Sequence, residues 1–305
     1  MSGFKLKTPV AFLIFNRPDV TQKVFEEIRR ARPPKLLVVA DGPRVNRPGE
    51  AEKCQSVRAI IDTVDWPCEV LKNYSDVNLG CKRRVSSGLD WVFEQAEEAI
   101  ILEDDCLPHP SFFGFCEELL EKYRDDERIG IISGDNFLFG RRRTDNSYYF
   151  SRYTHIWGWA SWRRTWQTYD VEMKSWPLVK NGMWLTDILH DKKQVKYWSD
   201  IFESVFNGQI DTWDYQINFN NFVHSRLNIM PNQNLISNIG FGVEATRTIQ
   251  KCKCAEMPIF EMKFPLIHPQ MIIRDAQADS ITEEDQFRSP TVATRIINKI
   301  RRIIA

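Results

Sequence analysis

The sequence has no excess of charge of either sign. Its 305 residues include 41 basic and 41 acidic side chains, so the formal net charge is zero. Such a chain has no overall field that would concentrate a polyanion at its surface, and nucleic acid is therefore not an expected partner. The sequence also lacks any run of about 18 apolar residues, the length that a helix needs to cross a bilayer.

The cysteines and the N-terminal apolar run also lack the patterns of a zinc site and of a signal peptide; the one close cysteine pair is the C-x-C of Cys252 and Cys254. The seven cysteines include no C-x-x-C pair, which speaks against a zinc site and against a disulfide framework. The apolar run 9–15 near the start is followed by Asn16 and Arg17 instead of the small residues of a signal-peptide cleavage site. We therefore expect a cytoplasmic protein with reduced thiols.

Several catalytic motifs are also missing. No G-x-G-x-x-G follows the first apolar run, and no P-loop, G-x-S-x-G or H-E-x-x-H pattern occurs. Dinucleotide oxidoreductases, P-loop NTPases and the commonest hydrolases depend on these patterns. Those classes are not expected here.

Apolar runs and amphipathic stretches alternate along the first half of the chain. Short apolar runs predict buried strands, and apolar residues at helical spacing predict helices. The predicted strands are 10–15, 35–40, 68–71, 99–102 and 129–133, and the predicted helices are 20–32 after an Asp19 N-cap, 51–63, 86–95 and 111–123. The alternation indicates one compact α/β domain whose mostly parallel sheet is flanked by helices.

Three consecutive acids, Glu103, Asp104 and Asp105, directly follow the predicted strand 99–102. In open parallel sheets the carboxyl ends of strands border the ligand crevice. Adjacent carboxylates stay ionised together only if a cation compensates them. Mg²⁺ or Mn²⁺ suits oxygen ligands and often completes its shell with substrate phosphates. The alternative is a solvated acidic turn.

Further motifs follow in a recognisable order. Asn78-Leu79-Gly80 precedes the acid triplet, with Gly88 ten residues after Asn78. The later motifs are the tryptophan-rich segment 156–164, the segment 212–216 and the segment 234–242. Together with the acid triplet they resemble the GT-A-fold glycosyltransferases, in particular bacterial relatives of N-acetylglucosaminyltransferase I and of the family 2 enzymes.

This resemblance implies a function and a division of the chain. It implies inverting transfer of a sugar from a nucleotide-sugar donor, a UDP-sugar, to a saccharide or lipid-linked acceptor in surface glycan biosynthesis. It also implies a GT-A fold in which residues 1–135 bind the nucleotide sugar and residues 136–250 bind the acceptor. Residues 251–305 form a C-terminal extension.

The resemblance also assigns roles to single residues. Asp105 matches the direct metal ligand, and Glu103 and Asp104 lie beside the donor. Asp214 matches the base that takes the acceptor proton. Spacing alone leaves Asp211 as a rival base, and the alternative for Asp214 is an ordinary helix-capping or surface acid.

The remaining donor contacts are expected around the ends of the first strands. The resemblance implies donor contacts there, and polar residues after the strands border the crevice of an open sheet; Arg17 and Asp41 are alternatively turn residues in salt bridges. These expected contacts are Asn16, Arg17, Asp41, Asn78, Gly80, Lys82 and Arg83. Whether Lys82, Arg83 or Arg84 is the donor-contacting cation stays open.

Aromatic and histidine residues of the second half have two readings. Trp159, Trp162 and Trp166 stand at helical spacing and predict a core-facing stripe. Trp157 or Trp213 is suited either to stacking on a sugar or to the core. The alternatives for His155 and His268 are a place near the donor or metal and a structural role.

Residues 290–305 carry cations and apolar residues at helical spacing. This pattern predicts a basic amphipathic helix, which either contacts an anionic membrane surface at its cytoplasmic face or docks on the domain.

Two other functions compete with the glycosyltransferase. A sugar-phosphate nucleotidyltransferase shares the open sheet and the metal. Enzymes of that class, however, have a glycine-rich loop after the first strand, where this chain has Asn16-Arg17-Pro18-Asp19. A non-catalytic carbohydrate-binding protein would use the tryptophans and would bind no nucleotide.

Overall fold

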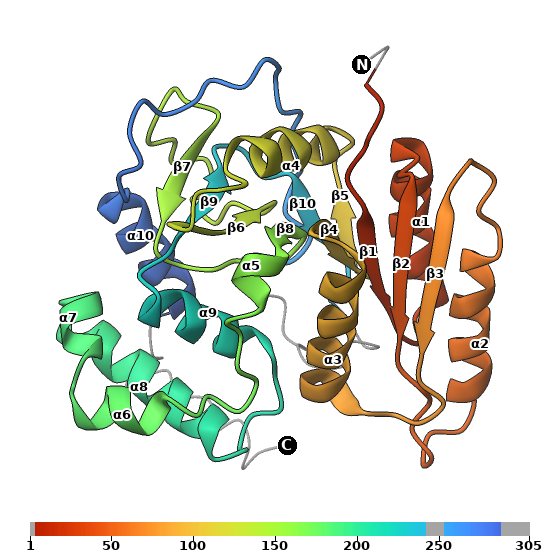
Figure 1. Cartoon of the computed structure of the whole chain (residues 1–305), viewed down its shortest axis with the longest axis horizontal. Helices are drawn as coiled ribbons and strands as arrows, with labels where there is room; N and C mark the ends of the chain where they lie inside the picture. The colour runs from red at the N-terminus through yellow and green to blue at the C-terminus, as the bar shows by residue number, and fades with distance from the viewer. Residues whose placement is uncertain (1–3, 242–252, 288–305) are drawn as a thin grey trace.

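A mixed eight-stranded sheet runs through the molecule, with helices against both of its faces (Figure 1). The structure is a computed structural model that describes residues 4–241 and 253–287. The order of the strands is β3-β2-β1-β4-β8-β6-β9-β7, and β5 and β10 form a separate two-stranded sheet. The strands are β1 Val10–Ile14, β2 Lys35–Ala40, β3 Glu69–Tyr74, β4 Glu98–Glu103, β5 Cys106–Pro108, β6 Ile129–Ser133, β7 Tyr148–Ser151, β8 Trp159–Trp162, β9 Leu227–Pro231 and β10 Ile236–Asn238.

The helices fill the connections between these strands. They are α1 Pro18–Ala31, α2 Glu50–Ile61, α3 Gly80–Gln95, α4 Ser111–Lys122, α5 Arg163–Trp166, α6 Trp176–Asn181, α7 Leu185–Leu189, α8 Lys192–Phe206, α9 Asp214–Val223 and α10 Ala276–Thr282, which continues into a π-helical turn, Glu283–Phe287. Among these described helices, none is long and apolar enough to cross a membrane.

The first four strands are parallel, as the sequence predicted. β1 lies between β2 and β4, with Val10 opposite both Leu36 and Ile100. Because parallel strands end at the same edge of a sheet, the residues that follow β1, β2 and β4 meet there. This edge carries the candidate site.

The two faces of β1 belong to two different hydrophobic clusters. Side chains of a strand alternate between the faces of the sheet. Phe12 packs in a cluster with α1, α2 and α4, whereas Ala11 and Leu13 pack in a cluster with α3, α5 and α9. The strand is apolar throughout because both faces are covered.

Two helix starts differ from the prediction. α1 begins at Pro18 with Arg17 as its N-cap residue and no side-chain cap, so the expected Asp19 cap is wrong. Proline is pre-organised for the first helical position, and it fixes the start two residues earlier. α3 begins at Gly80 and not at residue 86. The prediction missed its first turn because that turn is polar and shows no apolar periodicity.

The tryptophan stripe is core but not helix. Trp159 and Trp162 are the ends of β8, which pairs antiparallel with β4 and β6. Three residues apart on a strand, they point to opposite faces, and each packs in a different hydrophobic cluster. Only Trp166 lies in a helix, the short α5. A spacing of three fits a helix locally, but pairing with strands on both sides overrides that preference.

The single sheet crosses the predicted boundary at residue 135. β6 comes from the first predicted half, and its neighbours β8 and β9 come from the second. A further cluster joins α6, α7, α8 and α9 around Trp198 and Phe202. Residues 290–305, with the predicted amphipathic helix, lie outside the described residues.

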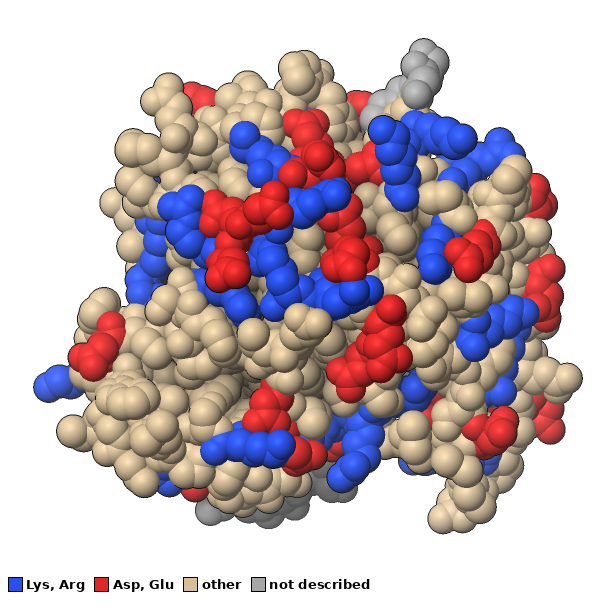
Figure 2. Space-filling view, in the orientation of Figure 1, with Lys and Arg blue, Asp and Glu red and all other residues tan. Residues whose placement is uncertain are grey.

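Charges of both signs are interspersed on the face shown in Figure 2, in keeping with the zero net charge. Ion pairs near the surface, such as Arg124–Glu98 and Arg128–Asp126, combine the two signs of charge. Such pairs contribute little to stability.

Cysteine chemistry departs from the expectation at one position. Cys54, Cys68, Cys81, Cys106 and Cys116 are free. Cys254, however, is disulfide-bonded, so the expectation of thiols throughout is wrong there.

The packing of α3 on the sheet generates a first prediction. A Cβ built on Gly88 would lie 2.4 Å from Cγ1 of Val39 on β2. We expect Gly88→Ala to cost about 1–3 kcal/mol through overpacking, reduced by the higher helix propensity of alanine, about 1 kcal/mol. Thermal unfolding measures the net loss. Ser87→Ala, exposed on the same helix, serves as the control, and a Gly88→Ala protein stabilised by the full helix-propensity gain of about 1 kcal/mol would contradict this packing.

Candidate functional site

A cavity of about 610 Å³ lies at the carboxyl edge of β1, β2 and β4. This volume is within the usual range for small-molecule sites. Most residues predicted from the sequence line it. They are Arg17, Asp41, Asn78, Gly80, Glu103, Asp104, Asp105, Asp211 and Asp214.

The acid triplet begins at the last residue of β4 and continues into the turn that leads to β5. Asp104 is buried and accepts a hydrogen bond from the backbone N–H of Phe15 at 3.3 Å. Burial raises the pKa of Glu103, and the charges of Asp105, Asp104 and Asp214 raise it further. Burial likewise raises the pKa of Asp104, against the opposing effect of Arg17. The triplet is therefore a crowded and partly desolvated set of carboxylates, not a solvated turn.

Arg17 supplies the compensating positive charge. One of its guanidinium nitrogens, Nη2, lies 2.9 Å from Oδ2 of Asp105 and also forms an ion pair with Asp104. Burial lowers the pKa of Arg17, but the two aspartates outweigh this and raise it overall. Arg17 is thus directed at the acids. The sequence analysis had expected it to contact the donor.

The carboxylate of Asp41 is hydrogen-bonded to backbone N–H groups at the start of α3. It accepts hydrogen bonds from the backbone N–H groups of Gly42 and Leu79, both at 2.9 Å, and of Gly80 at 3.2 Å. The amide of Asn78 donates a further bond at 3.0 Å. Burial raises the pKa of Asp41, while these hydrogen bonds from backbone N–H groups act in the opposite direction. In the structure, Asp41 and Asn78 join the end of β2 to the first turn of α3 through these hydrogen bonds.

Both candidate bases reach the cavity from the start of α9. Asp214 is the first residue of that helix, and its carboxylate accepts the hydroxyl of Thr212 and the backbone N–H of Tyr215, the latter at 3.0 Å. Asp211 is exposed in the preceding turn, where its Oδ2 would lie 3.4 Å from a Cβ on Gly80. The contribution of Asp214 to the raised pKa of Glu103 shows that these two carboxylates interact.

The three cations at the start of α3 point to different places. Arg84 lines the cavity, and its guanidinium donates to the backbone carbonyls of Ala40 and Asn73. Lys82 pairs with Glu172 at 2.9 Å instead, and Arg83 is exposed. Neither is among the residues that line the cavity, so the structure brings only Arg84 of these three to the site.

Asn16 also lies off the cavity. Its amide donates to Glu50 at 2.8 Å, and Glu50 is held by Arg44. It therefore supports the cavity wall behind Arg44, a residue that the sequence analysis did not select. The guanidinium of Arg44 lies over the ring of Phe15, 5.6 Å from its centre, and both residues line the cavity. The polar turn 41–44 after β2 was the only sequence signal for Arg44.

The two tryptophans that border the cavity differ in what covers them. Trp213 is only 2% exposed and stacks on Trp159 with a centroid distance of 5.9 Å, as a core residue does. Trp157 is only partly buried, and its ring meets the edge or face of Phe137 and Phe241. Of the two, Trp157 is the one with ring surface available to a ligand.

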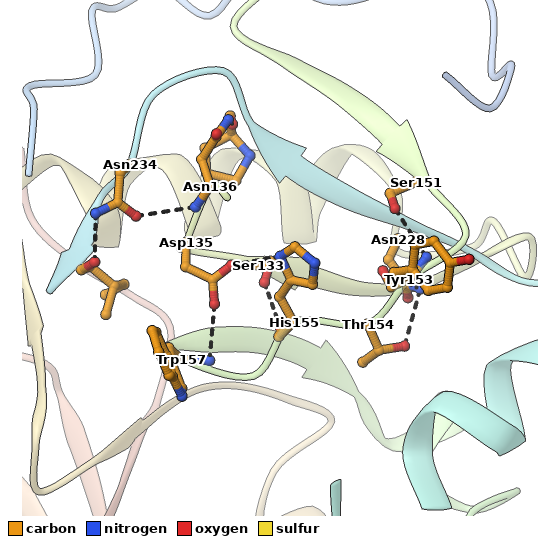
Figure 3. A network of polar contacts seen from close by, with 12 residues as sticks. Ser133, Asp135, Asn136, Ser151, Tyr153, Thr154, His155, Trp157, Asn228 and Asn234 are labelled. Carbon is orange, nitrogen blue, oxygen red and sulfur yellow. Dashed lines mark hydrogen bonds and ion pairs between the residues drawn. The ribbon is translucent and has the colours of Figure 1, made fainter. Parts of the chain in front are cut away.

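A buried polar network stands behind Trp157 (Figure 3). Asp135 accepts the backbone N–H of Trp157 at 3.3 Å and lies 2.6 Å from Nδ1 of His155. His155 is 4% exposed and does not line the cavity, so it positions Asp135 and is not placed to touch a donor. His268 bonds to the hydroxyl of Tyr148 and to Glu118, and it too is not among the lining residues.

The carboxylates fit a divalent ion that arrives with a substrate. Carboxylate oxygens are the ligands that Mg²⁺ prefers. Within residues 4–241 and 253–287, no three acidic, histidine or cysteine side chains form a ready-made cage. A substrate-bridging ion needs only one or two carboxylates, because phosphates and waters complete its shell. Glu103, Asp104 and Asp105 all line the cavity, and Asp105, with a side chain 15% exposed against 6% for Asp104, could hold such an ion.

Comparison with known proteins adds little to this description. No family model and no curated protein matches the chain. Among solved structures it is similar to the galactosyltransferase LgtC, which was determined in complex with donor and acceptor sugar analogues; the TM-score is 0.36 and the identity 11%, over 71% of this chain and 70% of that one. A similarity this low carries no argument about the chain.

The contacts of Asp41 generate a second prediction. In Asp41→Asn, one oxygen that accepts N–H groups becomes an NH₂ group that faces them, whichever way the amide turns. We expect a loss of about 1–3 kcal/mol of unfolding free energy, the usual penalty for unsatisfied buried polar groups. Denaturant titration measures it. Asp145→Asn, fully exposed, should change stability by no more than about 0.5 kcal/mol; equal stability of the two variants would rule out the capping role.

Proposed function

We propose that this chain is a metal-dependent glycosyltransferase of the GT-A type. In this proposal it moves a sugar from a UDP-sugar to a saccharide or lipid-linked acceptor, with inversion, in surface glycan biosynthesis. The observation that carries the proposal is the meeting of two sets of acids in one cavity, the triplet at the end of β4 and the pair at the start of α9. One set suits a diphosphate with its cation, and the other suits an acceptor hydroxyl.

Asp214 is the proposed general base. The acceptor oxygen forms a bond to the anomeric carbon while the bond from that carbon to the donor phosphate oxygen breaks. The hydroxyl proton passes to the carboxylate of Asp214, which is bound by Thr212 and Tyr215 and so has a fixed orientation. Asp211 lines the same cavity and remains the rival for this step.

The donor side is built from residues after β1, β2 and β4. Phe15, with Arg44 over it, offers a flat surface for a base, and Arg84 adds positive charge near the start of α3. Asp105 is proposed to hold Mn²⁺ or Mg²⁺. When bound, such an ion offsets the negative charge that develops on the leaving diphosphate. Trp157 offers ring surface for a sugar on the acceptor side.

Nucleotide binding tests the donor site directly. We expect UDP with Mn²⁺ to raise the melting temperature, because a ligand at about 100 times its Kd stabilises the native state by about 2.7 kcal/mol. The panel contains UDP, GDP, CMP and dTDP, each with Mn²⁺ and with EDTA. A shift for one nucleotide that vanishes in EDTA supports the metal-diphosphate site. The absence of a shift with every nucleotide would contradict that site.

Variants of the metal acid test Asp105. Asp105→Asn is expected to lose the Mn²⁺-dependent part of the UDP shift, because the amide is a weaker ligand for a hard cation. The exposed Asp125→Asn should keep the whole shift. An unchanged Mn²⁺ effect in Asp105→Asn would move the metal to another residue.

Variants of the two bases separate Asp214 from Asp211. We expect Asp214→Asn to bind UDP with Mn²⁺ as wild type does and to release UDP from a UDP-sugar about 10²–10⁴ times more slowly, the usual contribution of a general base. Asp211→Asn is the matched variant and should keep most of that rate. The reverse result, a slow Asp211→Asn and a normal Asp214→Asn, would assign the base to Asp211.

A further inference from the structure

The contact between Arg17 and the acid triplet occupies a side of Asp105 that faces the cavity. Arg17 leaves the end of β1 as the residue before α1, and its side chain is only 16% exposed. Its Nη2 atom bonds to Oδ2 of Asp105 at 2.9 Å and to Asp104. All three residues line the cavity. A cation is therefore already present on the carboxylate that is proposed to bind another.

The chain segment after β10 is fitted closely around this ion pair. A Cβ on Gly240 would lie 2.0 Å from Oδ2 of Asp105 and 2.6 Å from Nη1 of Arg17. Any side chain at residue 240 would therefore collide with the pair. The absence of a Cβ leaves the space that the guanidinium needs beside Asp105.

The other arginines of the cavity have different partners. Arg44 pairs with Glu50, and Arg84 donates to Ala40 and Asn73. Within the described residues, the ion pairs of the triplet are those with Arg17. Its charge is therefore specific to the triplet and not part of a general basic lining.

We propose that Arg17 is a built-in counter-ion that competes with the divalent ion for Asp105, so that the ion and the diphosphate bind together and each binds poorly alone. The inference rests on the proposed metal-diphosphate site. A divalent ion at Asp105 must displace the guanidinium or lie beside it, and like charges at such distances repel. A guanidinium that has lost Asp105 in a largely buried position needs another anion.

A diphosphate supplies that anion. The planar guanidinium matches phosphate oxygens in geometry and charge. The metal on Asp105 and the phosphate near Arg17 then each remove the cost of binding the other. Such coupling is reciprocal, so UDP must tighten Mn²⁺ binding by the same factor as Mn²⁺ tightens UDP binding. Arg17 would thus pair with Asp105 before the substrates bind and with the diphosphate afterwards.

Mn²⁺ binding to the full chain tests the proposal without any activity measurement. The electron paramagnetic resonance signal of free Mn²⁺ gives its Kd for wild type and for Arg17→Gln, with and without UDP. Without UDP, we expect Arg17→Gln to bind Mn²⁺ about tenfold more tightly than wild type, and with UDP the gain in affinity should be about tenfold smaller than in wild type. Lys82→Gln removes the same charge from a residue that pairs with Glu172, and it should leave both values unchanged.

The outcomes separate the counter-ion from the metal site itself. If Arg17→Gln binds Mn²⁺ without UDP no more tightly than wild type, the counter-ion role is overturned while the metal site stands. If Lys82→Gln tightens Mn²⁺ binding as much, general electrostatics replaces the specific contact, and the role is again overturned. If wild type binds neither Mn²⁺ nor UDP, the proposed function fails first.

Arg17→Lys covers the case in which the glutamine variant does not fold. Lysine keeps the positive charge that the buried acids need but lacks the planar guanidinium. We expect it to fold and to bind Mn²⁺ without UDP more tightly than wild type. A lysine variant with wild-type Mn²⁺ affinity and wild-type gain from UDP would overturn the role assigned to the guanidinium.

Discussion

The neighbouring carboxylates at the end of β4 are the constraint on which the rest of the site depends. They are crowded and largely removed from water, so their ionised forms are costly unless a cation lies beside them. The sheet supplies that cation because β1 is the parallel neighbour of β4, with Leu13 opposite Glu103. The residues after β1 therefore arrive beside the acids. The order of the strands, more than any single contact, brings Arg17 and Asp105 together.

Partners distinguish the structural acids of the cavity from those suited to chemistry. Asp41 has both carboxylate oxygens engaged by N–H groups at the start of α3, and a ligand would have to break that cap to use it. The carboxylate of Asp105 instead forms an ion pair with the guanidinium of Arg17. Asp214 has a fixed orientation at the start of a helix and borders the same space. Three similar side chains in one cavity thus have different partners.

Much of the first half could be predicted from the sequence, and the failures have physical causes. Continuous apolar runs predicted β1, β2 and β4 because strands covered on both faces have no other pattern. The same reasoning brought the triplet to the correct edge. It misread Trp159 and Trp162, because a strand confined between two others and a turn of helix share that short spacing. It also missed the partners of Arg17, which lie 87 and 88 residues away in the chain, since local patterns carry no record of such pairing.

The position of β4 has a mechanical consequence. It is bonded to β1 on one side and to β8 on the other, so the sheet continues without a break from the proposed donor side to the proposed acceptor side. The two sides therefore share one sheet and are not two domains that close on each other about a hinge. The acids that follow β4 are anchored by this sheet, and α9, which carries Asp214, packs against the same sheet through Ile217. In the proposed enzyme, the acids of the site would therefore be aligned before the substrates arrive.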